Sequence, residues 1–160
     1  MKVIGIDPGL SGGFALVEDG GLIHVDGVPI FKASGRGNDV DWASLSAAML
    51  LTCDGADHCF IERVGARPGQ GSSSMFKFGY TAGGVRGIIA VMNIPVTLVV
   101  PGKWKKAMGL SASKDAAVAR AADLFPTHAT AFRGPKGGLR DGLAEAALIA
   151  KYGYDTLVLR

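Results

Sequence analysis

Three apolar stretches open the chain, and the short connections between them restrict what it can fold into. They cover residues 2–7, 14–18 and 22–28. The last two are separated by EDGG, whose Asp-Gly pair is typical of a hairpin turn. The chain is therefore expected to begin with a three-stranded antiparallel meander.

Further along, the pattern alternates between helices and strands. A polar, glycine-containing segment at 32–39 is expected to be a loop, and Asp39 or Asp41 caps a short helix through Trp42 and Met49. The later elements are expected as a strand at 58–64, a glycine-rich linker at 65–74, a long helix at about 74–92, a strand at 96–100 and helices at 102–108, 113–125 and 141–152.

This order of elements predicts an α/β fold. We expect a mixed five-stranded sheet flanked by helices, in which the first three strands are antiparallel and the two later strands lie parallel to the first. Neither an internal repeat nor an interdomain linker is evident, so residues 1–160 are expected to form a single domain.

The composition agrees with a compact folded protein. Hydrophobic residues make up 48% of the chain and charged residues 19%, which excludes general disorder. No apolar run approaches the length of a membrane span, and Asp7 and Pro8 lie where a signal peptide would need apolar residues. We therefore expect a cytoplasmic protein without membrane contact. Cys53 and Cys59 match no familiar zinc pattern.

The charge is unevenly distributed along the chain. The net charge is +3 and the pI about 9.0. Acidic residues crowd the first third, whereas basic residues gather before the last helix, which favours a polyanionic partner. These basic residues are Lys103, Lys105, Lys106, Lys114, Arg120, Arg133, Lys136 and Arg140.

Four acids have apolar surroundings: Asp7, Glu62, Asp141 and Glu145. Asp141 and Glu145 lie four positions apart and share one face of the last predicted helix. Carboxylates that cluster repel one another unless cations lie among them, and hard oxygen ligands suit Mg²⁺ or Mn²⁺. Two such ions can ionise a water molecule and stabilise the leaving oxygen of a phosphodiester.

Each acid also has a simpler interpretation. Asp141 could cap its helix, Glu62 could pair with Arg63, and Asp7 could cap the turn that follows its strand. Other chemistries are poorly supported, because the sequence contains neither a GxSxG motif nor a Walker A loop and its three histidines are scattered.

The long predicted helix has two unlike faces. Phe78, Val85 and Ile89 are expected to pack on the sheet, whereas Gly79, Gly83 and Gly87 lie on the other side. Glycines inside a helix cost about 1 kcal/mol each, so close approach of another backbone is the usual reason for them. Either a two-fold partner helix or the chain's own C-terminal helices could supply that backbone.

Five motifs together resemble the RuvC-like Holliday junction resolvases of the ribonuclease H-like superfamily, most closely the compact members that bacteriophages encode. The resemblance covers most of the chain, and the ordered set is more specific than any single motif. The motifs are IGIDPG (4–9), IERV (61–64), FKFGYTAGGVRGII (76–89), WKKAMGLSASKDAA (104–117) and DGLAEAALIAKYG (141–153).

The resemblance implies a homodimeric endonuclease, dependent on Mg²⁺ or Mn²⁺, that nicks two opposed strands of a four-way DNA junction. Two ions per active site are expected, and no nucleotide cofactor. By position, the resemblance implies that the metal-binding catalytic acids are Asp7, Glu62, Asp141 and Glu145. It implies DNA contacts at Lys105, Lys106 and Lys114, and an aromatic residue, Phe76, that stacks at the junction centre. The dimer interface would contain Gly79, Gly83 and Gly87.

Three rival functions remain open at this point. The chain could cut flaps and forks as well as four-way junctions, or it could bind junctions without cutting them. A sugar kinase or actin-like ATPase also has an Asp-x-Gly turn after its first strand, but it needs a second large domain. The last acid is Glu145 rather than the aspartate of the bacterial resolvases, and it lies one residue further from Asp141.

Overall fold

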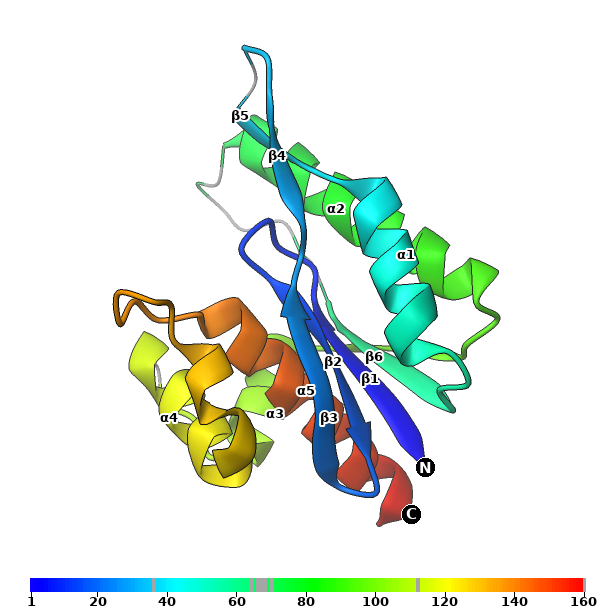
Figure 1. Ribbon diagram of the computed structural model, residues 1–160, viewed down its shortest axis with the longest axis vertical. Helices are drawn as coiled ribbons and strands as arrows, with labels where there is room; N and C mark the ends of the chain where they lie inside the picture. The colour runs from blue at the N-terminus through cyan, green and yellow to red at the C-terminus, as the bar shows by residue number, and fades with distance from the viewer. Residues whose placement is uncertain (36, 64, 66–68, 70, 112, 160) are drawn as a thin grey trace.

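A five-stranded mixed sheet lies at the centre of the structure, a computed structural model that describes residues 1–35, 37–63, 65, 69, 71–111 and 113–159 (Figure 1). The strand order is β3-β2-β1-β6-β7. β1 pairs antiparallel with β2 and β2 with β3, whereas β6 is parallel to β1 and β7 to β6. This arrangement confirms the predicted sheet. The strands are β1 (Lys2–Asp7), β2 (Gly13–Glu18), β3 (Gly21–Gly27), β6 (His58–Glu62) and β7 (Val96–Val99).

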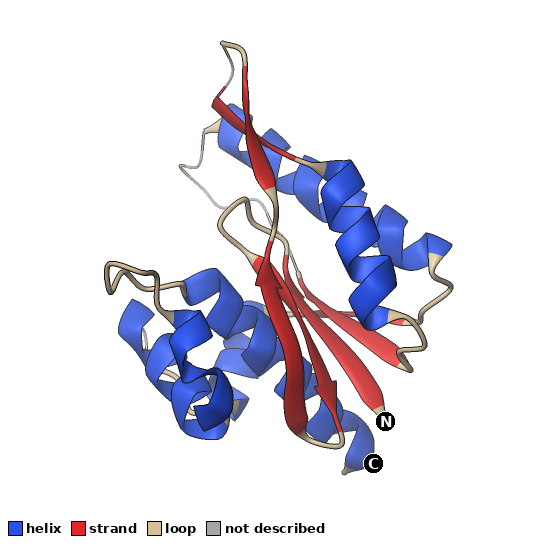
Figure 2. Ribbon diagram, in the orientation of Figure 1, coloured by secondary structure: helices blue, strands red, loops and turns tan. Residues whose placement is uncertain are grey.

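Helices cover both faces of this sheet (Figure 2). Successive side chains of a strand point to opposite faces, so β1 contributes Val3 to one face and Ile4 and Ile6 to the other. The Val3 face packs against the C-terminal helices, and the Ile4 face packs against the first two helices. The helices are α1 (Trp42–Cys53), α2 (Ser72–Val91), α3 (Pro101–Ala107), α4 (Lys114–Leu124), the 3₁₀ helix η1 (Pro126–Phe132) and α5 (Asp141–Val158).

The predicted helix caps are partly confirmed. Asp41 rather than Asp39 caps α1, since its Oδ1 accepts a hydrogen bond from the Ser44 backbone N–H at 3.0 Å. Ser113 caps α4, as the sequence predicts. α5 runs to Val158, six residues beyond the predicted end, because Tyr154 and Leu157 still pack against the core.

Residues 30–40 form a hairpin where the sequence predicted a loop. β4 (Ile30–Ala33) pairs antiparallel with β5 (Gly37–Val40) as a separate two-stranded sheet. Gly35 and Gly37 adopt positive φ values of 70° and 79°, which let the chain reverse between the strands. Gly35 and Gly37, which the sequence placed in a loop, therefore help the chain to turn between two strands. The hairpin projects away from the central sheet (Figure 1).

Other expectations concern particular residues. Cys53 and Cys59 are buried free thiols. Four residues of the predicted linker, 66–68 and 70, lie outside the described residues, as does Val64 at the end of the predicted strand 58–64, and residues 72–74 already belong to α2. Within the described part of the chain, no helix combines the length and apolarity needed to span a bilayer.

Candidate active site

The register of the sheet brings Asp7 and Glu62 side by side. β1 and β6 are parallel, and Ile6 pairs with Ile61, so the next residue of each strand is one of the two acids. Both acids end their strands, at the same edge of the sheet. By alternation they share the face of Val3 and Phe60, against which α5 packs.

Small residues let α5 approach β1 closely enough to place a third acid there. A Cβ atom at Gly5 would lie 2.3 Å from the backbone oxygen of Ala146, so only glycine fits. At the start of the helix, a Cβ atom at Gly142 would lie 2.1 Å from the backbone oxygen of Ser11 in the β1–β2 connection. Glu145 lies between these two contacts along the helix, and its charge acts on Asp7.

The environment of Asp7 strongly disfavours its ionised form. Burial, followed by the charges of Glu62 and Glu145, raises the pKa of Asp7 to about 7 from an ordinary value of 3.8. The Gly9 backbone N–H and Lys105 act in the opposite direction. The effect of the Gly9 backbone N–H on the pKa of Asp7 is compatible with the simpler interpretation, in which Asp7 caps the turn after its strand.

α3 supplies a hydrogen-bond donor to each of the two glutamates. The indole Nε1 of Trp104 donates to Glu62 Oε1 at 2.9 Å, and Lys105 Nζ donates to Glu145 Oε1 at 2.7 Å. Lys105 Nζ also lies 5.2 Å from the centre of the Trp104 ring. Lys105, which the resemblance identifies as a DNA contact, is therefore paired with one of the candidate acids in this structure.

Asp141 is the first residue of α5 rather than its cap. Arg140 occupies the cap position, and no side-chain hydrogen bond caps the helix. Asp141 Oδ1 accepts from the Gly142 backbone N–H at 3.2 Å. The side chain lines a depression together with Ser11 and Asp26, beside the β1–β2 connection. The helix-cap interpretation is therefore wrong, and Asp141 lies one turn of helix before Glu145.

The four acids fit a hard divalent cation by their chemistry. All supply carboxylate oxygens, the ligands that Mg²⁺ and Mn²⁺ prefer. A cation would favour the ionised form of Asp7, whose pKa is raised first by burial and then by the charges of Glu62 and Glu145. In the described ranges, however, no three acidic, histidine or cysteine side chains are arranged to hold a metal ion. Glu62 instead has a hydrogen bond from Trp104, and Glu145 has one from Lys105.

The other predicted DNA contacts lie at several places. Lys106 is exposed on α3, and Lys114 begins α4, although its side chain lies outside the described residues. Phe76, near the start of α2, is 75% exposed and therefore lies on the outer side of that helix. The Phe76 ring stacks on the Tyr80 ring, with 6.3 Å between the two ring centres.

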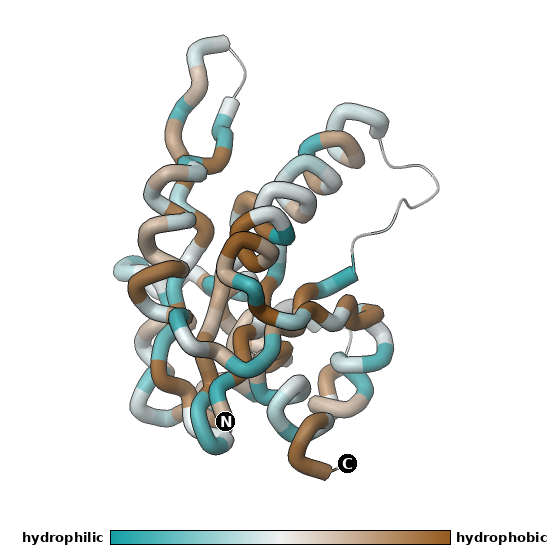
Figure 3. Tube along the Cα trace, turned by 90° about the vertical axis from the view of Figure 1, so that its right-hand side faces the viewer, coloured by the Kyte–Doolittle hydropathy of each residue, from teal (hydrophilic) through white to brown (hydrophobic). Residues whose placement is uncertain are grey.

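Gly79, Gly83 and Gly87 lie along an open face of α2. A Cβ atom at any of them would meet no heavy atom within 4 Å. The chain's own C-terminal helices therefore do not cover them, which removes one of the two explanations for these glycines. They line a mostly apolar groove of about 720 Å³ between α1 and α2. In Figure 3 the first turns of α2 are mostly pale, and brown turns follow toward the C-terminal end of the helix.

The sequence reasoning missed three residues at these sites. Trp104 was read only as part of a helix, although the one aromatic residue of the lysine-rich segment 102–108 is a candidate for burial, and a buried indole N–H needs an acceptor. Tyr80 lies one turn after Phe76 and could have been found by that spacing. Gly84 was given no role, yet a Cβ atom there would lie 2.2 Å from Trp42 Cη2.

Comparison with known proteins gives matches only among solved structures. No family model matches the chain, and no curated protein matches its sequence. RuvC of Thermus thermophilus in complex with a Holliday junction substrate matches with a TM-score of 0.69 and 18% identity, over 99% of this chain and 96% of that one. A second Thermus thermophilus RuvC structure matches with a TM-score of 0.66 and 20% identity, over the same shares of the two chains.

A mitochondrial protein has a more distant similarity. The crystal structure of the yeast mitochondrial Holliday junction resolvase matches with a TM-score of 0.52 and 16% identity, over 94% of this chain and 77% of that one. Along almost its entire length, the chain thus has the ribonuclease H-like fold of RuvC.

Proposed function

We propose that this protein is a divalent-metal-dependent endonuclease that resolves four-way DNA junctions. The observation that carries the proposal is the placement of Asp7 beside Glu62 at one edge of a RuvC-type sheet, where burial and the charges of Glu62 and Glu145 raise the pKa of Asp7 to about 7. Structural relatives that are Holliday junction resolvases support the same activity. We place the activity in a single cytoplasmic domain. Similarity to the phage-encoded members stays a prediction.

In the proposed reaction Asp7, Glu62, Asp141 and Glu145 would hold two Mg²⁺ ions. When bound, such ions polarise the phosphodiester and lower the pKa of a water nucleophile. The chain's own part is to present carboxylates from two strands and one helix at a common edge. Lys106 and Lys114 would neutralise DNA phosphates, with Lys105 close to the reacting phosphate, and Phe76 would stack on a base at the junction centre.

The direct test compares three DNA substrates in the presence of Mg²⁺. An immobile four-way junction, a flap and a linear duplex are incubated with the protein, and the nicks are mapped on each strand. We expect paired, symmetric nicks in the junction and no cleavage of the duplex. Equal cleavage of the flap would identify a broader branched-DNA nuclease. Junction binding without any nick in Mg²⁺ or Mn²⁺ would identify a binding protein and overturn the proposal.

We also propose that two copies of the chain pair through the glycine face of α2. The face is open, it borders an apolar groove, and symmetric cleavage of two strands needs two active sites. Glycines at positions 79, 83 and 87 would let two helix backbones approach closely, and the exposed side chain of Val91 would extend the contact.

Gly83→Ala distinguishes a paired helix from a solvated one. Alanine would stabilise a solvated helix by about 1 kcal/mol, because a Cβ atom there meets nothing in the same chain. Between two packed backbones the same methyl group should raise the dimer dissociation constant at least about 10-fold, or about 1.4 kcal/mol. Analytical ultracentrifugation measures the constant, and thermal melting checks the fold.

Gly84→Ala is the matched control on the same helix. Its Cβ atom would clash with Trp42 within one chain, so we expect a lower melting temperature at every protein concentration. The dimer proposal fails if Gly83→Ala raises stability and leaves the oligomeric state unchanged.

A further inference from the structure

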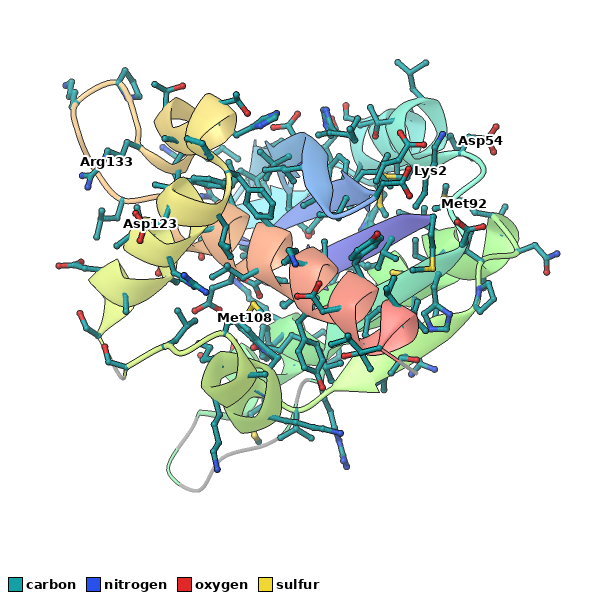
Figure 4. All side chains as sticks on the ribbon, turned by 90° about the horizontal axis from the view of Figure 1, so that it is seen from below. Lys2, Asp54, Met92, Met108, Asp123 and Arg133 are labelled. Atoms are coloured by element: carbon teal, nitrogen blue, oxygen red, sulfur yellow. The ribbon has the colours of Figure 1, made fainter. Side chains whose placement is uncertain are left out.

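Trp104 is built into the core and yet reaches the candidate active site. Its side chain is fully buried, in a cluster with Met108, Phe132 and residues of α4 and α5. Met108, at the end of α3, lies next to α5 in the view from below (Figure 4). The position of the Trp104 ring is therefore set by packing on several elements.

The chain path explains how this ring meets Glu62. In the sheet Glu62 pairs with Val99, the last residue of β7. α3 begins two residues later with Pro101, so its first turn lies beside the end of β6. Trp104 belongs to that first turn, and its Nε1 donates to Glu62 Oε1 at 2.9 Å.

An indole N–H is well suited to orient a carboxylate. It is a donor only, so it binds an oxygen that accepts and cannot exchange roles with it. The ring is rigid and buried, so the direction of the N–H bond is determined by the core rather than by solvent. Groups that hold a metal-binding carboxylate in this way are worth about 10- to 100-fold in metal affinity or activity.

We propose that Trp104 is a positioning residue for Glu62: its indole N–H holds the carboxylate at the sheet edge beside Asp7. The inference deepens the proposed nuclease function and rests on it. Trp104 does not touch DNA or the reacting phosphate in this assignment. It acts through Glu62 alone.

The first test is kinetic. Trp104→Phe keeps an aromatic ring in the core and removes only the N–H group and part of the ring. We expect junction nicking to slow about 10- to 100-fold, and the Mg²⁺ concentration for half-maximal rate to rise about 10-fold. Junction binding in EDTA should stay within about twofold of the wild type. An unchanged rate and Mg²⁺ dependence would overturn the assignment.

A packing control separates positioning from general damage to the core. Phe132 is fully buried in the same cluster, on η1. Phe132→Leu should lower the melting temperature by a similar amount but leave the Mg²⁺ dependence unchanged. If Phe132→Leu and Trp104→Phe shift the Mg²⁺ dependence equally, the effect of Trp104 is one of packing, and the assignment is wrong.

The second test does not need activity. The chain has two tryptophans, so a ¹H–¹⁵N spectrum shows two indole signals, and Trp104→Phe identifies one of them by its loss. Without metal, Glu62→Gln should move that signal and leave the Trp42 signal in place. Mg²⁺ titration of the wild type should move the same signal. If neither change moves it, the Trp104–Glu62 contact is absent in solution and the assignment fails.

The two tests together separate the two proposals. If the wild type nicks junctions but Trp104→Phe is unimpaired, the nuclease function stands and the positioning role fails. If the wild type never nicks but the Trp104 signal responds to Glu62→Gln and to Mg²⁺, the positioning role stands and the nuclease function fails.

Discussion

A Glu62→Gln variant is expected to nick four-way junctions at least about 10³-fold more slowly than the wild type, a loss of about 4 kcal/mol of transition-state stabilisation. The amide has nearly the same shape as the carboxylate and still offers an oxygen to the Trp104 N–H, so the fold should be preserved. It lacks the negative charge that a divalent cation requires. Single-turnover cleavage with Mg²⁺ measures the rate, and a gel-shift titration in EDTA should show unchanged junction affinity.

Glu18→Gln is the matched control for this prediction. Glu18 lies at the far end of β2, where it pairs with Lys2 at 3.9 Å near the surface. Removing its charge should leave the nicking rate within about twofold, since substitutions of exposed charges away from the site have small effects. If Glu62→Gln nicks within about tenfold of the wild type, Glu62 is not a metal ligand.

The second large effect concerns Asp7. Removing its charge is expected to raise the free energy of unfolding, although it abolishes nicking. In the folded protein the pKa of Asp7 is raised from 3.8 to about 7. Between these pH values the folded state binds a proton that the unfolded state has released, so the free energy of unfolding falls as pH rises. Without metal, the wild type should therefore be more stable at pH 5 than at pH 8.

Asp7→Asn should remove most of this dependence. The amide is neutral at every pH, so at pH 8 in EDTA we expect the free energy of unfolding to rise by about 2 to 4 kcal/mol. The melting temperature should then increase by about 5 to 10 °C. The same substitution should abolish nicking. Thermal melts at pH 5 and pH 8, with and without Mg²⁺, measure these effects.

An exposed aspartate is the control for the stability prediction. Asp123→Asn on α4 should change the free energy of unfolding by less than about 0.5 kcal/mol at either pH. If Asp7→Asn is no more stable than the wild type at pH 8 in EDTA, burial and the charges of Glu62 and Glu145 do not raise the pKa of Asp7 in the folded protein.

Taken together, the two variants connect the site to the fold. Asp7 sits where burial and two glutamates oppose its charge, and a residue that is unfavourable for folding in this way is typical of a functional site. Mg²⁺ should raise the melting temperature of the wild type and leave that of Asp7→Asn nearly unchanged, because a bound ion stabilises only the state that binds it.

Much of the architecture could be read from local patterns. Short apolar stretches bounded by turn residues identified all five strands of the central sheet, and the order of strands and helices correctly indicated which pairs are parallel. The hairpin at 30–40 was missed because its glycines form a turn between short strands that are exposed along most of their length. Local pattern also ended α5 too early, since its last turns are held by tertiary contacts of Tyr154 and Leu157.

The sequence by itself determined which residues are chemically unusual: four acids in apolar settings, and glycines on one face of a long helix. Only the tertiary structure decided how they meet. The β1–β6 register sets Asp7 beside Glu62, and the close fit of α5 on Gly5 brings Glu145 to them. Trp104 reaches Glu62 across 42 positions of sequence. Such contacts depend on strand register and helix seating, which arise from packing over the whole chain rather than from any local pattern.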